Sequence, residues 1–250
     1  MTVHPDAAIG FARAAAAYER GRPGYPPEAV AWLRDRVGIT VGRRILDLAA
    51  GTGKLTRMLV PTGATLVAAD PVHAMLRALD TATGGAAQAV VAIAQALPLP
   101  DGAVDGIVVA QAFHWFATDD ALAEMARVLA PDGTIALVWN SRRLDDPLQG
   151  AITGIVEPHR GDAPAHATGR WRDAIDRSTY VRLTDTRTVP HSVRCDIDGL
   201  VDRVLSISFV AALDEAGRAE VERDVRALEQ RFGATPVLRY RCEVHLLTPR

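Results

Sequence analysis

The stretch Arg44-Ile45-Leu46-Asp47-Leu48-Ala49-Ala50-Gly51-Thr52-Gly53-Lys54-Leu55 decides the fold of this chain. It is typical of an apolar strand, a sharp turn of small residues and the start of a helix. A turn with so little side-chain bulk lets the backbone press directly against a ligand. About twenty positions on, a second apolar strand ends at Asp70, whose carboxylate can accept hydrogen bonds from both hydroxyls of a ribose. Together these features predict the nucleoside-binding half of a doubly wound sheet.

Two common phosphate-binding motifs do not fit this turn. A P-loop needs glycine five residues before the Gly-Lys pair and Ser or Thr after the lysine, but Leu48 and Leu55 stand there. The dinucleotide fingerprint G-x-G-x-x-G/A ends here in Thr56. The turn therefore does not predict a pyrophosphate, and a nicotinamide-dependent oxidoreductase is disfavoured.

Apolar segments and helical periods alternate along the chain. We expect strands at 44–48, 65–69, 88–93, 105–110 and 134–139, with helices at 53–60, 72–82 and 119–130. This alternation predicts a parallel sheet with helices on both faces. Further expected elements are helices at 7–19 and 28–37, a strand at 180–191, a charged helix at 214–232 and a final strand at 240–246.

Composition excludes several classes of protein. The 250 residues are 48% hydrophobic and 23% charged, with a net charge of −2, which provides no general field for nucleic acid or an anionic membrane. No apolar run reaches the length of a membrane span, and the first residues lack the features of a signal peptide. The two cysteines are too few for a disulfide framework, and no Cys/His spacing predicts a metal. We expect a cytoplasmic monomer or homodimer with no metal, nucleic acid or membrane partner.

The chain resembles class I S-adenosylmethionine-dependent methyltransferases, in particular the methyltransferase type 11-like small-molecule group, over residues 11–145. The resemblance is carried by Tyr18-Glu19-Arg20-Gly21-Arg22-Pro23-Gly24-Tyr25-Pro26, the loop from Asp47 to Gly53, Asp70-Pro71 with Met75-Leu76, Ala94-Gln95-Ala96-Leu97-Pro98-Leu99-Pro100-Asp101, and residues 104–116 followed by Arg127-Val128-Leu129-Ala130-Pro131-Asp132-Gly133. Two positions depart from the family pattern. The family usually has glycine where Ala49 stands and an acidic residue where Gln95 stands.

The resemblance implies an α/β, Rossmann-like doubly wound sheet of seven strands, mostly parallel, with the last strand antiparallel and inserted. It implies a single domain, 1–250, with an N-terminal helical lid at 1–40, a cofactor-binding core at 41–140, a cap insertion at 141–179 and C-terminal strands and helices at 180–250. The implied cofactor is S-adenosyl-L-methionine. Its expected binding residues are Tyr18, Arg22, Asp47, Ala49, Gly51, Gly53, Asp70, Pro71, Met75, Ala94, Gln95, Ala96 and Gln111.

Several of these residues also have a purely structural interpretation. Asp70 binds the ribose or caps the helix that follows it. Asp47 organises loop amides, meets the cofactor's amino group, or is a structural turn carboxylate. Gln95 reads the edge of the adenine or is a solvated loop residue, while Met75 lines the adenosine pocket or is core. We expect Ala49 to adopt an ordinary negative φ, because the neighbouring Ala50 shows that the loop accommodates methyl groups.

The acceptor side of the site is less defined by the sequence. His114, after the fourth strand, is the candidate general base, or only hydrogen-bonds within its turn while Trp115 and Phe116 pack in the core. Arg22, in the segment that folds over the cofactor in the resembled family, pairs with the methionine carboxylate or is a surface residue. A basic run between residues 159 and 172 faces an anionic acceptor or only solvent.

The leading hypothesis is an enzyme that transfers a methyl group from S-adenosylmethionine to a small-molecule acceptor. Because Ala49 departs from the family pattern and no catalytic base is obvious, we also keep a catalytically silent module that binds S-adenosylmethionine or S-adenosylhomocysteine in a regulatory or scaffold role. Fold alone does not give the acceptor.

Overall fold

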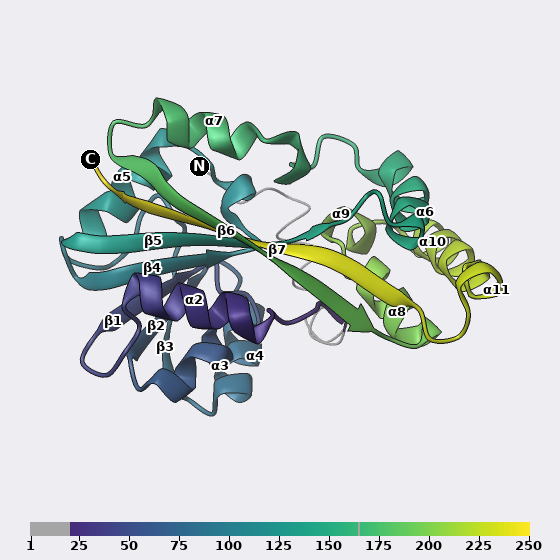
Figure 1. Ribbon diagram of the computed structural model, residues 1–250, viewed down its shortest axis with the longest axis horizontal. Helices are drawn as coiled ribbons and strands as arrows, with labels where there is room; N and C mark the ends of the chain where they lie inside the picture. The colour runs from purple at the N-terminus through teal and green to yellow at the C-terminus, as the bar shows by residue number, and fades with distance from the viewer. Residues whose placement is uncertain (1–20, 165) are drawn as a thin grey trace. The chain divides into compact units, whose positions relative to one another are not determined.

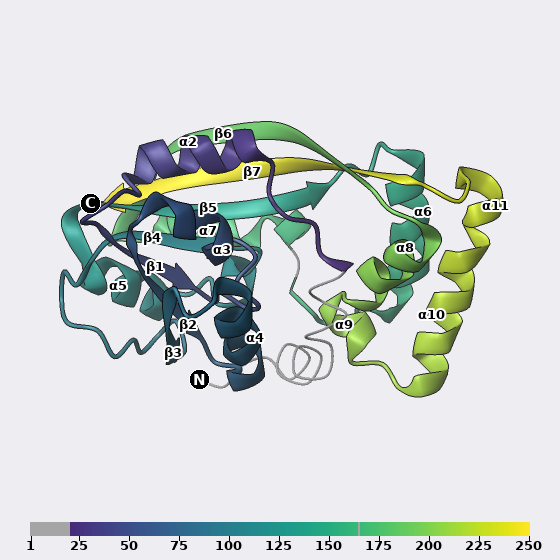
Figure 2. The same ribbon diagram turned by 90° about the horizontal axis from the view of Figure 1, so that it is seen from below.

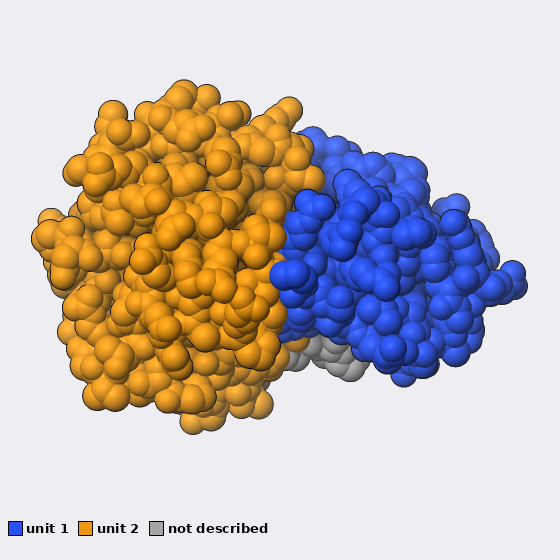
Figure 3. Space-filling view, viewed as in Figure 1, with its two compact units in different colours: residues 1–24, 141–163, 190–241 blue, residues 25–140, 164–189, 242–250 orange. Residues whose placement is uncertain are grey.

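A computed structural model describes residues 21–164 and 166–250 of the chain, which divide into two compact units (Figure 3). Unit 1 contains residues 21–24, 141–163 and 190–241 among those described, and unit 2 contains 25–140, 164–189 and 242–250. The predicted helix at 7–19 and the residue Tyr18 lie outside the described residues.

Seven strands form one sheet in the order β3-β2-β1-β4-β5-β7-β6 (Figure 1). The pairs β1–β2, β1–β4, β2–β3 and β4–β5 are all parallel, as the alternation of strands and helices predicted. The strands are β1 (Arg44–Leu48), β2 (Thr65–Asp70), β3 (Ala87–Val91), β4 (Val104–Ala110), β5 (Leu129–Arg142), β6 (Val181–Arg194) and β7 (Val237–Pro249).

The last strand runs antiparallel to its neighbour β6. Arg250 N donates to Tyr180 O at 3.0 Å at one end, and Thr184 Oγ1 donates to Leu246 O at 3.1 Å further along. Residue numbers therefore fall along β7 as they rise along β6. Since β7 also lies between β5 and β6 in the sheet, the expected inserted antiparallel strand is confirmed.

Unit 2 has a hydrophobic cluster on each face of the sheet, because successive strand side chains point to opposite sides. On one face, Leu46 and Leu48 of β1 pack in a cluster with α5 (Asp119–Val128) and α7 (Arg170–Arg177). On the other, Ile45 belongs to a cluster with α2 (Pro27–Val37), α3 (Thr56–Leu59) and α4 (His73–Thr83). The prediction of helices on both faces is confirmed.

Helix α2, which the sequence analysis assigned to the lid, packs in the core of unit 2 instead. Pro27 occupies its first turn, and Gly38 ends it with φ 74°. Its buried positions Ala29, Leu33 and Val37 recur every four residues and so form one apolar face. The helix lies along β6 (Figure 2), where Arg187 Nη2 donates to Glu28 Oε1 at 2.6 Å.

The expected cap at 141–179 is divided between the two units. Residues 141–163, with α6 (Pro147–Val156) and the 3₁₀ turn η3 (Glu157–His159), belong to unit 1. Helix α7 belongs to unit 2, because Trp171, Ala174 and Ile175 form an apolar face that packs on the sheet. A second 3₁₀ turn, η4 (His166–Thr168), precedes it.

The C-terminal half of unit 1 contains two helices that the sequence analysis missed, α8 (Ile197–Leu205) and α9 (Ser208–Ala211). The predicted charged helix at 214–232 is formed by α10 (Glu215–Ala227) and α11 (Glu229–Phe232). Across residues 21–164 and 166–250, no helix is both long and apolar enough to cross a membrane.

Strand β5 begins five residues before the expected 134, at Leu129. The reason is an irregularity in its pairing with β4, where Val104 pairs with Leu129 but Gly106 pairs with Thr134. The residues in between interrupt the regular register of the pair, which no hydrophobic alternation can reveal. For the same reason α5 ends at Val128 rather than at 130.

The two glycines of the loop after β1 are constrained differently. Gly53 has φ 80°, and a Cβ there would lie 2.8 Å from Leu79 Cγ of α4. Gly51 has φ 57°, and a Cβ there would meet no atom within 4 Å. Gly53 is thus required by packing as well as by backbone conformation, whereas Gly51 is constrained by conformation alone.

We therefore expect Gly53→Ala to lower the free energy of unfolding by about 2–5 kcal/mol, from left-handed backbone strain of about 1–2 kcal/mol and a packing clash of about 1–3 kcal/mol. The matched variant Gly51→Ala has only the first cost and should lose about 1–2 kcal/mol. Urea unfolding of both variants measures the difference. Equal losses would mean that Leu79 moves aside without cost.

Candidate functional site

The loop between β1 and the first turn of α3 folds tightly against the end of β2. Ala50 N donates to Ala69 O at 3.1 Å, and Gly53 N donates to Ala50 O at 3.0 Å. Gly51 N donates to the carboxylate of Asp70, with its N–Oδ2 distance at 2.9 Å. The sequence motifs around Gly51 and Asp70 are thus joined by a direct hydrogen bond, although 19 residues separate them.

The expectation of a negative φ at Ala49 was wrong. Ala49 has φ 57°, in the left-handed region that favours glycine. The chain must turn sharply directly after Leu48 for the loop to return to β2, and this turn forces the conformation on whichever residue stands there. The departure from the family's usual glycine therefore stores backbone strain of about 1–2 kcal/mol.

Asp70 is not the conventional cap of α4. Helix α4 begins at His73, and its N-cap residue is Val72. Asp70 Oδ1 accepts from Val72 N at 2.8 Å, which is the amide of the cap residue itself rather than one inside the first turn. The helix-cap interpretation is therefore wrong. Asp70 ties the loop after β1 to the chain leaving β2.

The carboxylate of Asp70 keeps capacity for a ligand. Its side chain is buried, with Asp70 7% exposed. Burial raises its pKa, while the amides of Val72 and Gly51 oppose that rise. Each carboxylate oxygen has a second lone pair, so two amide bonds leave room for further donors such as ribose hydroxyls.

Asp47 contacts the start of α3. Thr56 Oγ1 donates to Asp47 Oδ2 at 2.6 Å, and Asp47 is 1% exposed. Its Oδ1 is buried with no hydrogen-bond partner among the described residues. Burial raises the pKa of Asp47 to about 7, against the opposing bonds from Thr56. We expected Asp47 to organise the loop amides, but the carboxylate that accepts from a loop amide is that of Asp70.

Residues 94–96 follow β3 as a small turn, where Ile93 and Ala96 form an isolated bridge. Ala94 is 6% exposed and belongs to the hydrophobic core, whereas Gln95 is half-buried and Ala96 is exposed. Gln95 is therefore the member of this turn whose side chain is available for a ligand.

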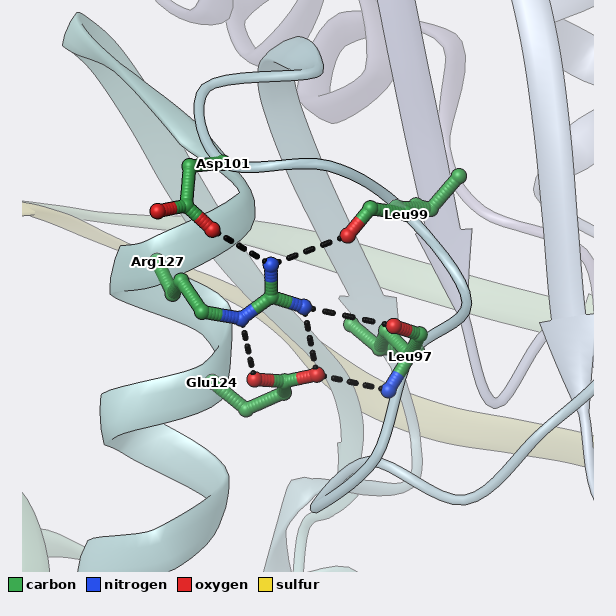
Figure 4. Close-up of polar contacts among 5 residues, drawn as sticks. All are labelled: Leu97, Leu99, Asp101, Glu124 and Arg127. Carbon is green, nitrogen blue, oxygen red and sulfur yellow. Dashed lines mark hydrogen bonds and ion pairs between the residues drawn. The ribbon is translucent and has the colours of Figure 1, made fainter.

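Arg127 of α5 holds the segment that follows this turn (Figure 4). Its Nη1 donates to Leu99 O at 2.9 Å, and its Nη2 donates to Leu97 O at 3.2 Å. Glu124 accepts from Arg127 Nε at 2.7 Å, and the same carboxylate accepts from Leu97 N at 2.7 Å. The fork geometry of a guanidinium suits this multiple contact. Arg127 thus links two motifs that the sequence analysis found separately, 94–101 and 127–133.

The residues after β4 include a second strained position. Gln111 has φ 61°, and its N donates to Val138 O at 2.8 Å. His114 lies in the 3₁₀ turn η2 (Phe113–Trp115), where its Nδ1 accepts from Trp139 Nε1 at 3.3 Å. A neutral imidazole that accepts at Nδ1 has its proton on Nε2 and donates there. In this tautomer His114 is not arranged as a base.

The aromatic residues beside His114 only partly match the structural interpretation. Phe113 is fully buried, and its ring meets that of Phe116 edge-on at 5.7 Å. Phe116 packs against the core from a half-buried position, and Trp115 is also half-buried. The core aromatic of this run is Phe113 rather than Trp115.

The remaining expected cofactor residues lie in different places. Met75 of α4 is 2% exposed, next to the core residue Leu76, and Pro71 is half-buried at the exit of β2. Arg22 belongs to unit 1, where its Nη2 donates to Ser206 O at 3.2 Å. Tyr18 lies outside the described residues. Tyr25, which the resemblance assigned to the N-terminal lid at 1–40, is 7% exposed in the core of unit 2.

A group of three potential metal ligands in unit 2 escaped the sequence analysis. One ligand atom from each of His166, Glu243 and His245 lies within 4.8 Å of the others. Burial lowers the pKa of His245 to about 4, so its ring is neutral at physiological pH. Glu243 and His245 are two positions apart on β7, but His166 comes from a distant part of the chain, so no local spacing could reveal the group of three. The expectation of no metal stays a prediction.

Comparison with known proteins agrees with this architecture. Residues 46–137 match a family model described as a methyltransferase domain. An uncharacterised methyltransferase of Mycobacterium tuberculosis is 48% identical over 137 residues, 55% of this chain and 54% of that protein. This chain therefore spans about half the length of the first curated relatives that it matches.

Two further relatives match over more of their length. An uncharacterised methyltransferase-like protein of Schizosaccharomyces pombe is 32% identical, covering 83% of this chain and 81% of that protein. The malonyl-[acyl-carrier protein] O-methyltransferase of Geobacter sulfurreducens is 42% identical, covering 76% and 77%. A candidate type II methyltransferase structure from Anaeromyxobacter dehalogenans has the same fold, with a TM-score of 0.67, 22% identity and coverage of 91% of this chain and 97% of that one.

The fold and the loop after β1 define the class: a Rossmann-like α/β protein with a nucleoside-type turn. The relatives then define the family, and the chain belongs to the class I S-adenosylmethionine-dependent methyltransferases. The cofactor of this family is S-adenosylmethionine. The alternative of a nicotinamide oxidoreductase is not supported.

The strain at Ala49 leads to a prediction for the stability of the variant Ala49→Gly. Ala49→Gly relieves about 1–2 kcal/mol of left-handed strain and adds about 0.4–1 kcal/mol of unfolded-state entropy. We expect the unfolding free energy to stay level or rise by up to about 1.5 kcal/mol. The control Ala50→Gly, at a position without positive φ, should lose about 0.4–1 kcal/mol in the same urea titration. A loss at Ala49 as large as that at Ala50 would contradict the strain.

Asp47 should make stability depend on pH. A carboxyl whose pKa rises from 3.8 to about 7 on folding binds its proton more tightly when folded, so its stabilising contribution fades between those values as pH rises. Asp47→Asn removes this titration and keeps an acceptor for Thr56. Relative to the parent, the variant should gain up to about 4 kcal/mol between about pH 4 and pH 7.5, at about 1.4 kcal/mol per pKa unit. A pH-independent difference in urea unfolding would refute this assignment.

Proposed function

We propose that this protein transfers a methyl group from S-adenosylmethionine to a small-molecule acceptor. The observation that carries the proposal is the hydrogen bond between Gly51 N and Asp70, which joins an open glycine turn to a buried carboxylate with spare acceptor capacity. A nucleoside with an attached side group needs the open turn and the carboxylate at the same place. Its ribose binds the carboxylate while the group attached to the ribose lies against the turn. Family membership supplies the identity of the nucleoside.

The residues of unit 2 fit the cofactor. Asp70 would accept from the ribose hydroxyls, and the open space beside Gly51 admits close approach to the backbone. The unpaired, buried Oδ1 of Asp47 would accept from the amino group of the methionine part. Gln95 would donate to and accept from the adenine edge. We also propose residues 41–140 as the cofactor-binding core, with the lid and the cap in the segments that flank it.

When bound, S-adenosylmethionine supplies an activated methyl group on a sulfonium. The protein's own task is then alignment, since holding two reactants in line lowers a barrier by up to about 7–11 kcal/mol. The hydrogen bond from Trp139 occupies the lone pair of His114 Nδ1, so we propose that this nitrogen does not deprotonate the acceptor. The acceptor is proposed to be small because a relative from Thermus thermophilus, 41% identical over 116 residues, is named a demethylmenaquinone methyltransferase, and demethylmenaquinone is a small molecule.

Calorimetric titration tests the cofactor assignment. We expect S-adenosylhomocysteine to bind at micromolar levels and NAD to show no comparable affinity. Asp70→Ala removes a charged acceptor worth about 1.5–3 kcal/mol, so the affinity should fall roughly ten- to a hundredfold. The control Asp80→Ala, at an exposed position on α4, should leave it unchanged.

A folded Asp70→Ala variant that binds like the parent would limit Asp70 to holding the loop. Turnover separates an enzyme from a catalytically silent binding module. Incubation of the protein with methyl-labelled S-adenosylmethionine and a small-metabolite extract should give a labelled product, detected by mass spectrometry. Binding without any labelled product across extracts would favour the silent module.

A further inference from the structure

Four arginines gather in unit 1, from segments far apart in the sequence: Arg22, Arg142, Arg160 and Arg203, the arginine cluster. Arg142 is the last residue of β5, and Arg203 lies on α8. Arg22 follows Gly21, where a Cβ would lie 2.6 Å from Arg203 N, and the charges of Arg22, Arg160 and Arg203 each act on Arg142. Like charges at short range repel, so something must compensate for their proximity.

Two members of the cluster, Arg142 and Arg203, each bury a guanidinium nitrogen that no described carboxylate contacts. Arg203 is 8% exposed, and its Nε donates to the hydroxyl of Tyr240 at 3.2 Å. Its Nη1, like Nη1 of the half-buried Arg142, is buried and has no hydrogen-bond partner among residues 21–164 and 166–250. Within that described part of the chain, neither residue forms an ion pair with a carboxylate. A buried guanidinium left in this state costs several kcal/mol.

The other two members are more conventionally paired. Arg160 donates to Glu157 through Nε at 2.7 Å and Nη2 at 2.9 Å, and its guanidinium lies 4.8 Å from the ring centroid of Phe209. Arg22 donates to Ser206 O. Glu157 therefore offsets the charge of Arg160 directly and acts on Arg142 only from beyond ion-pair distance, so in the described part of the chain no carboxylate contacts Arg142 or Arg203.

An arginine cannot escape burial by losing its proton at physiological pH. Burial and the neighbouring arginines lower the pKa of Arg142 only to about 10, so it stays charged at neutral pH. The remaining route to compensation is a bound anion. Guanidinium groups present parallel N–H donors that match the two oxygens of a carboxylate or phosphate.

We propose that the arginine cluster is a binding site for a small dianion carrying carboxylate or phosphate groups, held mainly by Arg142 and Arg203. The further step, that this dianion is the methyl acceptor, rests on the proposed function. It is supported by chain position: Arg142 stands at the carboxyl end of a central strand, where doubly wound sheets bind ligands. Unit 1 also lies outside the 46–137 family match, in the part of the chain where relatives with different substrates would differ.

Calorimetry of the full chain with citrate and with inorganic phosphate tests the site. Arg142→Met and Arg203→Met should each weaken anion binding roughly ten- to a hundredfold, because each removes charge-assisted hydrogen bonds. Arg223→Met, on the exposed face of α10 with the Arg223 side chain 70% exposed, should leave it unchanged. Tighter binding of citrate would assign a carboxylate ligand, and tighter binding of phosphate would assign a phosphate ester.

Arg142→Lys keeps the charge but loses the fork, so its affinity should fall between those of the parent and Arg142→Met. Thermal unfolding shows that each variant is folded, and removal of a buried uncompensated charge should not lower stability. Parent protein that binds neither anion, or that binds them no better than Arg203→Met, would overturn the proposal.

Titration of S-adenosylhomocysteine into the same samples keeps the two proposals separate. We expect Arg142→Met and Arg203→Met to retain the parent's affinity for it. Anion binding without S-adenosylhomocysteine binding would leave the arginine cluster standing and remove the methyltransferase assignment. The reverse result would remove only the anion site.

Discussion

The hydrogen bonds of Asp70 hold the candidate site together. One carboxylate oxygen accepts from Gly51 N and the other from Val72 N, so the turn after β1 and the exit of β2 become one rigid corner. Because β1 and β2 are adjacent and parallel, their carboxyl ends meet at one edge of the sheet. The strained Ala49 and the crowded Gly53 are consequences of folding the loop into that corner.

The buried charged groups of the two units differ in their hydrogen-bond partners. In unit 2, the carboxylates of Asp47 and Asp70 are buried but accept hydrogen bonds from Thr56 and from backbone amides. In unit 1, Arg142 and Arg203 bury guanidinium atoms without comparable partners in the described part of the chain. A carboxyl can relieve its burial by taking up a proton, whereas a guanidinium cannot. This asymmetry is why the arginines point to a ligand more strongly than the aspartates do.

Much of the architecture could be predicted from local patterns. The apolar run of β4, the small-residue turn after β1 and the helical periods of α4 and α5 each depend on neighbours in sequence, and all were found close to their observed bounds. The early start of β5 was missed because it depends on an irregular pairing with β4. Helix α7 was assigned to the cap because its apolar face becomes evident only once Trp171 meets the sheet.

The sequence by itself determined the strand-turn-helix at 44–55, the acidic end of the second strand and hence the family, since these depend on short-range spacing and residue size. Only the tertiary structure decided that Asp70 holds Gly51, that Ala49 is left-handed and that Trp139 fixes the His114 ring. It alone assembled Arg22, Arg142, Arg160 and Arg203. Contacts between residues tens or hundreds of positions apart are set by how strands and helices pack, and no local pattern in the chain encodes them.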